Sequence, residues 1–317
     1  MSEERVCLEE CEGVIFSYSP WVYRSGPLNL LACKDRVETV EGCPAGVKRV
    51  SCSGLYAAPC PFDAVIVPSL SNGARWYDEL YDAPGVADEE LVERHSMLGY
   101  CGGVVYGKLA AARHGYSAAG AIVTPRGTRV DIGGSDVIVA AVSVTRRSVY
   151  SIRSKTGRFP VEWLRGEGLL GDRTIVVGSW VASWEVEALR EAGALLAVAP
   201  VAQALYRGGP PPRPQYRGIV ALATGGLLDT PWALAYAALV EYAAVYWGIV
   251  DPEDVLAGLV RGWRLLGVEP RLGAAPIALI EARGFEGDPK TLILSRPVHR
   301  GSIWPGVEGG KGEAEAA

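Results

Sequence analysis

The chain is organised around residues 174–231, which read TIVVGSWVASWEVEALREAGALLAVAPVAQALYRGGPPPRPQYRGIVALATGGLLDTP. An amphipathic helix is predicted near the start of this stretch, with Ser183 as its N-cap and Gly193 at its end. Short apolar strands that alternate with helices indicate a parallel sheet covered by helices on both faces. Three apolar runs have the length of such strands: Thr174–Val177, Ala194–Pro200 and Gly218–Thr224.

Length and composition limit the class of protein. The 317 residues are enough for one large domain or two small ones. Hydrophobic residues make up 49% and charged residues 21%, which is typical of a globular chain and excludes a disordered one. The net charge is −5 and no basic stripe stands out, so we expect no nucleic-acid partner. Residues 1–25 lack the basic and apolar regions of a signal peptide, so we expect a cytoplasmic protein.

One segment is long enough to cross a bilayer. Residues 231–250 read PWALAYAALVEYAAVYWGIV and carry a single charge, Glu241. However, Thr230-Pro231 caps one end of the segment, and Asp251-Pro252 starts another helix directly after it. Ala, Tyr and Trp dominate the segment rather than Leu, Ile and Phe. We therefore expect a helix buried against the rest of the fold and no membrane partner.

The organising stretch resembles the second half of the metal-dependent amidohydrolases of the cytosine deaminase and chlorohydrolase group. In that family one strand ends in His-Gly-x-Trp, a helix and a strand ending in Cys-Pro follow, and a later strand reads Val-x-Leu-Gly-Thr-Asp. Val177 stands where the resemblance implies a metal-binding His, and Gly225 where it implies the catalytic Asp. The matching segments here are Val177–Trp180, Glu185–Ala194, Ala199-Pro200 and Val220–Gly225.

Two other signatures of the family also have counterparts. The signature at the end of the first strand matches Pro68–Trp76, in which Gly73 has no side chain to bind a metal and Arg75 is a permanent cation. The middle signature, a His followed three residues later by Glu, matches Ala141–Arg147. The positions at which the resemblance implies metal ligands or catalytic groups therefore hold Gly73, Arg75, Ala141, Val144, Val177 and Gly225.

The resemblance thus implies an amidohydrolase homologue that has lost its metal site. We predict no catalytic residue of that family, no metal and no other cofactor. The predicted function is that of a pseudoenzyme, which binds a small molecule or pairs with a second copy of itself or with an active amidohydrolase paralogue. The alternative is an active hydrolase of non-peptide C–N bonds that uses a non-standard site.

The resemblance and the strand pattern predict an α/β fold with a reduced TIM-type (β/α) barrel over residues 64–267. The two ends of the chain, residues 1–63 and 268–306, are expected to form a β-sandwich beside it, and residues 307–317 a disordered tail. A full barrel usually takes about 250 residues, and the span here is about 200. We place the shortage between Thr124 and Val137, where Arg129–Ile132 is a weak strand.

Two other segments complete the predicted fold. Asp88–His114 is predicted as mostly helical, with Asp88 as its N-cap. Residues 276–296 are predicted as two strands around a Gly-Asp-Pro turn. The three histidines of the chain fall on that helix (His95 and His114) and near the C-terminus (His299), so we interpret them as solvated or core residues rather than metal ligands.

The cysteines leave three alternatives open. Six of the seven lie in the first 60 residues. Asn, Gln and Met are rare, which suggests a thermophilic source, and intracellular disulfides occur in hyperthermophiles. No C-x-x-C pair is present, which weakens a zinc interpretation. Buried free thiols, disulfides and a structural metal all remain consistent with the sequence.

A binding site is predicted at the mouth of the barrel. The resemblance places Arg75 there, where the family holds its metal, and one fixed cation with aromatic walls suits a small anionic ligand. The competing interpretation is a closed mouth in which Arg75 pairs with Asp78. The predicted binding residues are Arg75, Trp76, Asp78, Trp180 and Gly225.

Overall fold

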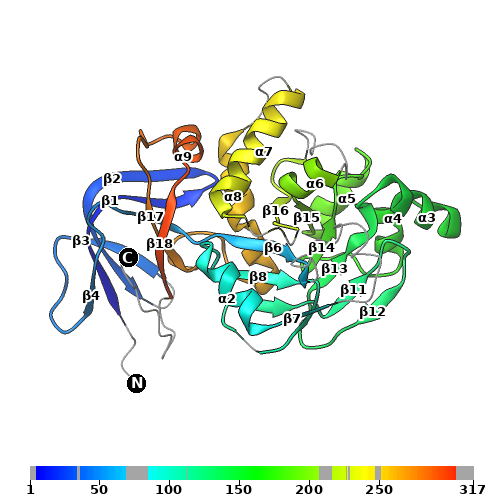
Figure 1. Cartoon of the computed structure of the whole chain (residues 1–317), viewed down its shortest axis with the longest axis horizontal. Helices are drawn as coiled ribbons and strands as arrows, with labels where there is room; N and C mark the ends of the chain where they lie inside the picture. The colour runs from blue at the N-terminus through cyan, green and yellow to red at the C-terminus, as the bar shows by residue number, and fades with distance from the viewer. Residues whose placement is uncertain are drawn as a thin grey trace.

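The computed structural model describes residues 5–33, 36–68, 85–111, 113–206, 216–225, 227, 229–246 and 251–304. It has a mixed α/β fold, with a β-rich part at one end and a region of alternating strands and helices at the other (Figure 1). None of the described helices is long and apolar enough to span a membrane. The predicted site residues Gly73, Arg75, Trp76 and Asp78 and the predicted tail 307–317 lie outside the described residues.

The two ends of the chain come together as predicted, and they form one mixed sheet where a β-sandwich was expected. Its strand order is β18 (Val298–Ile303), β17 (Ile277–Glu281), β5 (Tyr56–Pro59), β1 (Val6–Tyr18), β2 (Trp21–Cys33) and β3 (Arg36–Val40), and β4 (Lys48–Ser51) also pairs with β1. β1 and β2 form a long antiparallel hairpin, whereas β4 and β5 run parallel to β1. β5 pairs antiparallel with β17, which joins the N-terminal strands to the C-terminal ones.

Disulfides account for six of the cysteines, so pairing is the correct one of the three alternatives. The free thiol in the described chain is Cys33, which is buried. Two bridges join residues of the N-terminal part of the sheet to each other. The third leaves the sheet, because it links the residue after β5 to the residue before β8 (Gly102–Val105). The bridges are Cys7–Cys43, Cys11–Cys52 and Cys60–Cys101.

Residues 62–266 form a region that we call the barrel region. In its second half, each strand is parallel to the next, in the order β11 (Ala121–Val123), β13 (Ile138–Ala140), β14 (Thr174–Val177), β15 (Leu195–Val198) and β16 (Val220–Leu222). Helices connect and follow the strands from β13 onward, as the organising stretch predicts. They are α3 (Arg146–Thr156), α4 (Pro160–Gly166), α5 (Glu185–Ala192), α6 (Pro200–Tyr206), α7 (Pro231–Tyr246) and α8 (Pro252–Val260), with short 3₁₀ helices at Ala141–Ser143 and Arg261–Leu266.

The first half of the barrel region is a smaller parallel sheet, in the order β10 (Tyr116–Ala118), β8, β6 (Phe62–Ile66). Only Ala119 and Gly120 separate β10 from β11, so one interrupted strand joins the two sheets. A Cβ atom on Gly120 would lie 1.7 Å from the carbonyl oxygen of Ser135, so only glycine fits this close approach. β7 (Gly85–Ala87) and β9 (Gly107–Leu109) form a separate parallel pair.

One helix prediction in the barrel region is wrong, and the weak strand predicted at Arg129–Ile132 is confirmed. Asp88–His114 contains one helix, α2 (Glu89–Met97), followed by the two strands β8 and β9, and β10 comes just after the segment. Gly102 and Gly103 of β8 lie so close to neighbouring backbone and side chains that a Cβ atom would meet them within 2.6 Å, which favours a packed strand. Arg129–Asp131 (β12) pairs antiparallel with β11, so a hairpin replaces a connecting helix where we placed the shortage.

One strand prediction and one cap prediction need correction as well. Residues 289–295 form helix α9 rather than a strand, because the Asp288 carboxylate accepts hydrogen bonds from the backbone N–H groups of Lys290 and Thr291. α5 begins after Trp184 instead of Ser183, although it ends at Gly193 in the left-handed conformation, as predicted.

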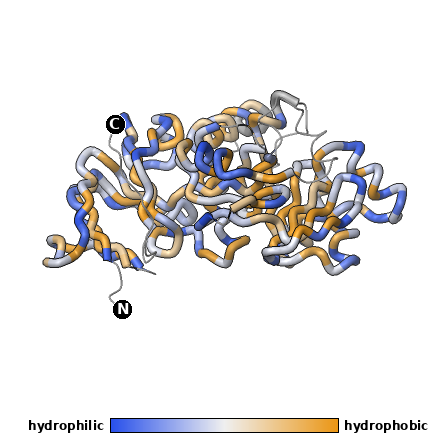
Figure 2. The backbone as a smooth tube through the Cα atoms, turned by 60° about the horizontal axis from the view of Figure 1, so that its bottom comes forward, coloured by the Kyte–Doolittle hydropathy of each residue, from blue (hydrophilic) through white to orange (hydrophobic). Residues whose placement is uncertain are grey.

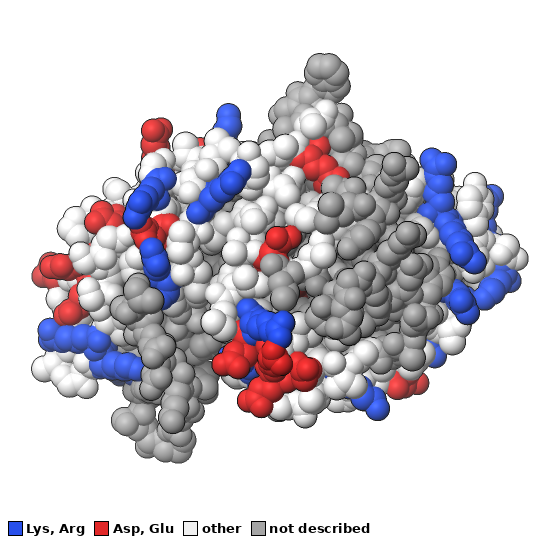
Figure 3. All heavy atoms as spheres, viewed as in Figure 1, with Lys and Arg blue, Asp and Glu red and all other residues white. Residues whose placement is uncertain are grey.

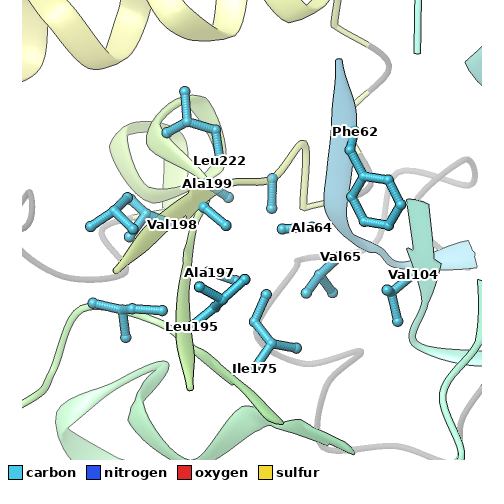
Figure 4. Packing of buried hydrophobic residues seen from close by; sticks show 14 of the residues in the cluster. Phe62, Ala64, Val65, Val104, Ile175, Leu195, Ala197, Val198, Ala199 and Leu222 are labelled. Atoms are coloured by element: carbon cyan, nitrogen blue, oxygen red, sulfur yellow. The ribbon is translucent and has the colours of Figure 1, made fainter. Parts of the chain in front are cut away.

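The interior of the barrel region is apolar. Side chains from β6, β8, β14 and β15 lie around one interior in Figure 4, among them Val65, Val104, Ile175 and Ala197, which are fully buried. Hydrophobic stretches run through the middle of this region, and hydrophilic stretches lie mostly at its outer edge (Figure 2). This burial fixes the strands, and with them the positions of the loops at the strand ends.

Candidate functional site

The described residues at the predicted metal-ligand positions lie at the carboxyl ends of three strands. Ala141 and Val144 follow β13, Val177 ends β14 and Gly225 follows β16. All four are buried, and none has a side-chain nitrogen, oxygen or sulfur atom for a metal. Across the residues that the structure describes, no group of three or more His, Cys, Asp or Glu could hold a metal ion. The described donors therefore do not fit a catalytic metal site of the kind the resemblance implies.

A buried polar cluster lies between β6 and β16. Asp63 is fully buried, and its Oδ1 accepts hydrogen bonds from the backbone N–H groups of Val65 and Thr224, each at 3.1 Å. Its Oδ2 accepts the hydroxyl of Thr224 and lies 2.9 Å from Nε2 of His95. Nδ1 of His95 lies 3.1 Å from the Tyr116 hydroxyl. The cluster joins β6, β10, β16 and α2 through groups that satisfy one another, so its role is structural.

The other two histidines are separate from this cluster. His114 was predicted on the long helix but lies outside α2, just before β10, and its ring contacts Trp304 with 4.1 Å between ring centroids. His299 lies in β18 of the mixed sheet, as expected, and burial lowers its pKa to about 4, so it is neutral at pH 7. The interpretation of His95 as a core residue is consistent with its burial and its hydrogen bonds.

A cavity of about 260 Å³ opens between α3 and the loop after β14. Its inner wall is formed by Ser179, Val181 and Tyr216, all buried. The Tyr216 hydroxyl donates a hydrogen bond to the Val181 carbonyl at 2.6 Å, and the Gln203 side-chain amide donates one to Ser179 Oγ at 3.0 Å. These bonds fix the loop that follows β14. The cavity therefore has a rigid inner wall.

Aromatic rings and two arginines form the outer part of the cavity. Arg146 lies over the ring of Trp180, and Arg153 over the ring of Phe159, each with Cζ 4.7 Å from the ring centroid. Tyr150, on the same helix, is an exposed ring at the rim. The cavity thus combines flat apolar surfaces with positive charge.

Glu185 fixes the loop after β14, which lines the cavity, relative to helix α4. This carboxylate is buried at the start of α5, and its Oε2 accepts the backbone N–H of Ala182 at 3.0 Å. Its Oε1 accepts the backbone N–H groups of Val161 at 2.7 Å and Glu162 at 3.4 Å, in the first turn of α4. Burial raises the pKa of Glu185, and the three backbone N–H groups oppose that rise. One side chain thereby ties the loop after β14 to the start of α4.

Helix α3, which carries both arginines, has a capped N-terminus. Thr145 is the N-cap of α3, and its side chain and that of Ser148 each bond the other's backbone N–H, which is a capping box. Arg146 and Arg153 are seven residues apart, which places them two turns apart on one face of α3. The cap therefore positions the cations at the cavity.

Trp180 is the predicted site residue that lines this cavity. Gly225 is not among its lining residues, and the other three predicted binding residues lie outside the described chain. Sequence reasoning missed Arg146 and Arg153 because it assigned the ligand's cation to Arg75. A signal was present, since residues 137–161 contain five basic residues and no acidic one. Figure 3 shows Lys and Arg gathered at the end of the molecule where Figure 1 places α3 and α4.

No protein-family model and no curated protein sequence matches the chain. Solved structures do match over almost the whole length. An adenosine deaminase from Xanthomonas campestris with bound zinc is 12% identical with a TM-score of 0.67, and the match covers 94% of this chain and 91% of that one. An amidohydrolase from Brucella melitensis is 9% identical with a TM-score of 0.68, covering 96% and 94%.

The guanine deaminase of E. coli gives the same result, with 10% identity, a TM-score of 0.66, and coverage of 97% of this chain and 99% of that one. At such low identity, the similarity concerns the fold rather than the activity. Both the mixed sheet from the chain ends and the barrel region fall within these matches, because almost no residue is left out. The chain therefore has the fold of metal-dependent amidohydrolases and deaminases.

Proposed function

We propose that this chain is a non-catalytic protein of amidohydrolase fold that binds a small molecule. The observation that carries the proposal is the set of buried residues without metal-binding atoms at three strand ends. These are Ala141 and Val144 after β13, Val177 at the end of β14 and Gly225 after β16. In enzymes of this kind, a metal polarises the substrate and generates the attacking hydroxide. Without its ligands, both contributions are lost.

Loss of the metal does not remove the fold's capacity to bind. Strand ends and their loops shape the binding surface in this class of fold, and they are held by the apolar interior rather than by a metal. The cavity beside Trp180 supports a binding role, because buried residues form its inner wall and aromatic rings its outer part. A closed, filled surface at these strand ends would instead have favoured a purely structural partner.

Metal content and hydrolysis test the proposal together. The purified full-length protein, prepared without chelators, is analysed for zinc, iron and manganese before and after incubation with zinc. Ammonia release is then measured with adenosine and guanine, with an active guanine deaminase assayed in parallel. We expect metal far below one ion per chain and no ammonia above the buffer rate. Near-stoichiometric metal together with ammonia release would show an active hydrolase with a non-standard site.

A further inference from the structure

The cavity beside α3 has a size and a lining that suit a flat ring. Its volume of about 260 Å³ is just below the range of about 300–1,000 Å³ that is usual for ligand pockets, so it suits a single-ring molecule. Val181 and Tyr216 are buried on its inner wall, and Phe159 and Trp180 are partly buried on its outer part. Such surfaces bind planar apolar groups by stacking and burial.

The rim of the cavity carries two arginines that form no ion pair with an Asp or Glu of the described chain. Within the described chain, neither Arg146 nor Arg153 has a carboxylate within ion-pair distance, although eleven other pairs, ten of them with an arginine, are present. Each guanidinium lies over a ring instead, and with no carboxylate of the described chain in ion-pair distance its N–H groups can donate to an anion. The surrounding segment adds three more cations and no acid: Arg147, Lys155 and Arg158.

We propose that this cavity binds a single planar ring that carries an anionic group, either a carboxylate or a phosphate. The ring lies against Trp180 and Phe159, and the anionic group reaches Arg146 or Arg153 at the rim. The two arginines are seven residues apart, or about 10 Å along α3, so one small anionic group binds one of them rather than both. This inference rests on the proposed function, since it names the ligand class of a binding protein.

Both parts of the ligand are required by the physics of the site. The two arginines are exposed, so solvent and salt screen a free anion there, and inorganic phosphate alone should bind weakly. A neutral ring would bury apolar area but leave the guanidinium edges unused. The need for both the buried ring and the charge on the anion distinguishes this site from a surface that attracts any anion.

Calorimetric titration of the full-length protein at low salt tests the proposal with four probes: phenyl phosphate, benzoate, benzyl alcohol and inorganic phosphate. We expect phenyl phosphate or benzoate to bind at least about tenfold more tightly than benzyl alcohol and inorganic phosphate, because one charge-assisted hydrogen bond is lost with the neutral probe and the ring contacts with the bare anion. If no aromatic anion binds, or inorganic phosphate binds equally well, the proposal is overturned.

Three variants locate the binding. The double variant Arg146→Gln/Arg153→Gln should weaken binding of the aromatic anion about tenfold, whichever of the two arginines holds it, whereas Arg147→Gln/Arg158→Gln removes the same charge from the same segment outside the cavity and should have little effect. Ala182→Phe fills the cavity without changing any charge and should abolish binding of the aromatic anion. Circular dichroism of each variant controls for folding. Equal weakening by both arginine variants, with binding retained in Ala182→Phe, would show a diffuse basic surface and refute the site.

A single-stranded oligonucleotide is the last probe. If it binds more tightly than phenyl phosphate, with strong salt dependence and equal losses in both arginine variants, then the basic segment is a nucleic-acid surface and the proposal is wrong. The metal and ammonia assays of the same preparation separate the two proposals. Metal and hydrolysis with unchanged probe binding would overturn the proposed function alone, whereas failed probe binding without metal would overturn only the site.

Discussion

The two halves of the barrel region differ in the structures that connect and cover their parallel strands. In the second half, from β13 onward, helices follow the strands, and the strands are almost uninterrupted runs of buried apolar residues. In the first half, from β6 to β10, the described chain has one helix, α2, and the other described connections hold short strands such as β7 and β9. The comparison shows that a parallel strand can lose its covering helix if other bonds hold it.

Those other bonds are polar and covalent. Asp63 spans from β6 to Thr224 after β16 and to His95 on α2, where the two outer strands are not hydrogen-bonded in a ladder. The Cys60–Cys101 bridge fixes the start of β6 to the start of β8. No comparable buried carboxylate joins β14 to β15 among the described residues, whose contacts are apolar. Polar changes within the strands should therefore cost more in the first half than in the second.

Asp63→Ala should have the largest effect. It leaves two backbone N–H groups, a hydroxyl and an imidazole without their acceptor in a fully buried place. We expect a loss of about 3–5 kcal/mol in the free energy of unfolding, measured by guanidinium denaturation. A loss below about 1 kcal/mol would mean that the cluster does not hold β6 to β16.

Two control variants sharpen this result. Asp131→Ala removes an exposed carboxylate that pairs with Arg129, and it should cost less than about 1 kcal/mol. Ile175→Val removes one methyl group from the buried strand β14 in the second half, and it should cost about 0.5–1.5 kcal/mol. If Ile175→Val proved as costly as Asp63→Ala, the contrast between the two halves would be lost.

Removal of the bridge between β6 and β8 should have the next largest effect. Cys60 and Cys101 are 41 residues apart, and a crosslink of that span stabilises by about 4 kcal/mol in the chain-entropy model. We expect the double variant Cys60→Ala/Cys101→Ala to lose about 3 kcal/mol, with faster hydrogen exchange in β6 and β8. Before reduction, mass spectrometry of the alkylated wild-type protein should show one modified thiol, Cys33.

The matched control is the bridge within the sheet. Cys7 and Cys43 are 36 residues apart, so their loss should cost a similar free energy of unfolding. It should leave hydrogen exchange in β6 and β8 unchanged, because both cysteines lie outside the barrel region. Equal acceleration of exchange in β6 and β8 by both double variants would argue against a local role for Cys60–Cys101.

The same contrast explains what the sequence could predict. Strands β14, β15 and β16 and helix α5 have strong apolar patterns, and their prediction is confirmed apart from the start of α5. β8 was missed because Gly102-Gly103-Val104-Val105 is short, and its glycines reflect close packing with residues far along the chain. Helix α9 was predicted as a strand. Asp288-Pro289 is a helix-start signal, but the apolar run that follows it was interpreted as a strand.

For the site, the resemblance located strand ends but could not provide the contacts between separate elements. Trp180 was predicted at a strand end, and it lines the cavity. Arg153 reaches the cavity because α3 packs beside the loop after β14, a tertiary relation that no local pattern contains. Asp63 was not singled out, since its four partners come from β6, α2 and the end of β16.

The smallest effect that we predict concerns the charge within the apolar second half. Glu241 lies on α7, part of its carboxylate is buried with no hydrogen-bond partner among the described residues, and burial raises its pKa from 4.5 to about 7. The folded protein therefore holds this proton more tightly than the unfolded chain does. Stability from this group is fully present below about pH 4.5 and is lost as the pH rises to about 7, because the unfolded chain ionises first.

Glu241→Gln removes that dependence. Because the side chain is only partly buried, solvent screening reduces the effect, and we expect the variant to be about 1 kcal/mol more stable than the wild type at pH 8 and equal to it at pH 4.5. Guanidinium denaturation at several pH values gives the difference between the two proteins, in which all other titrating groups cancel. Glu93→Gln, which changes an exposed carboxylate on α2, should give a flat difference within about 0.5 kcal/mol. A flat difference for Glu241→Gln as well would place its carboxylate in water, and α7 would then carry no buried charge in the second half.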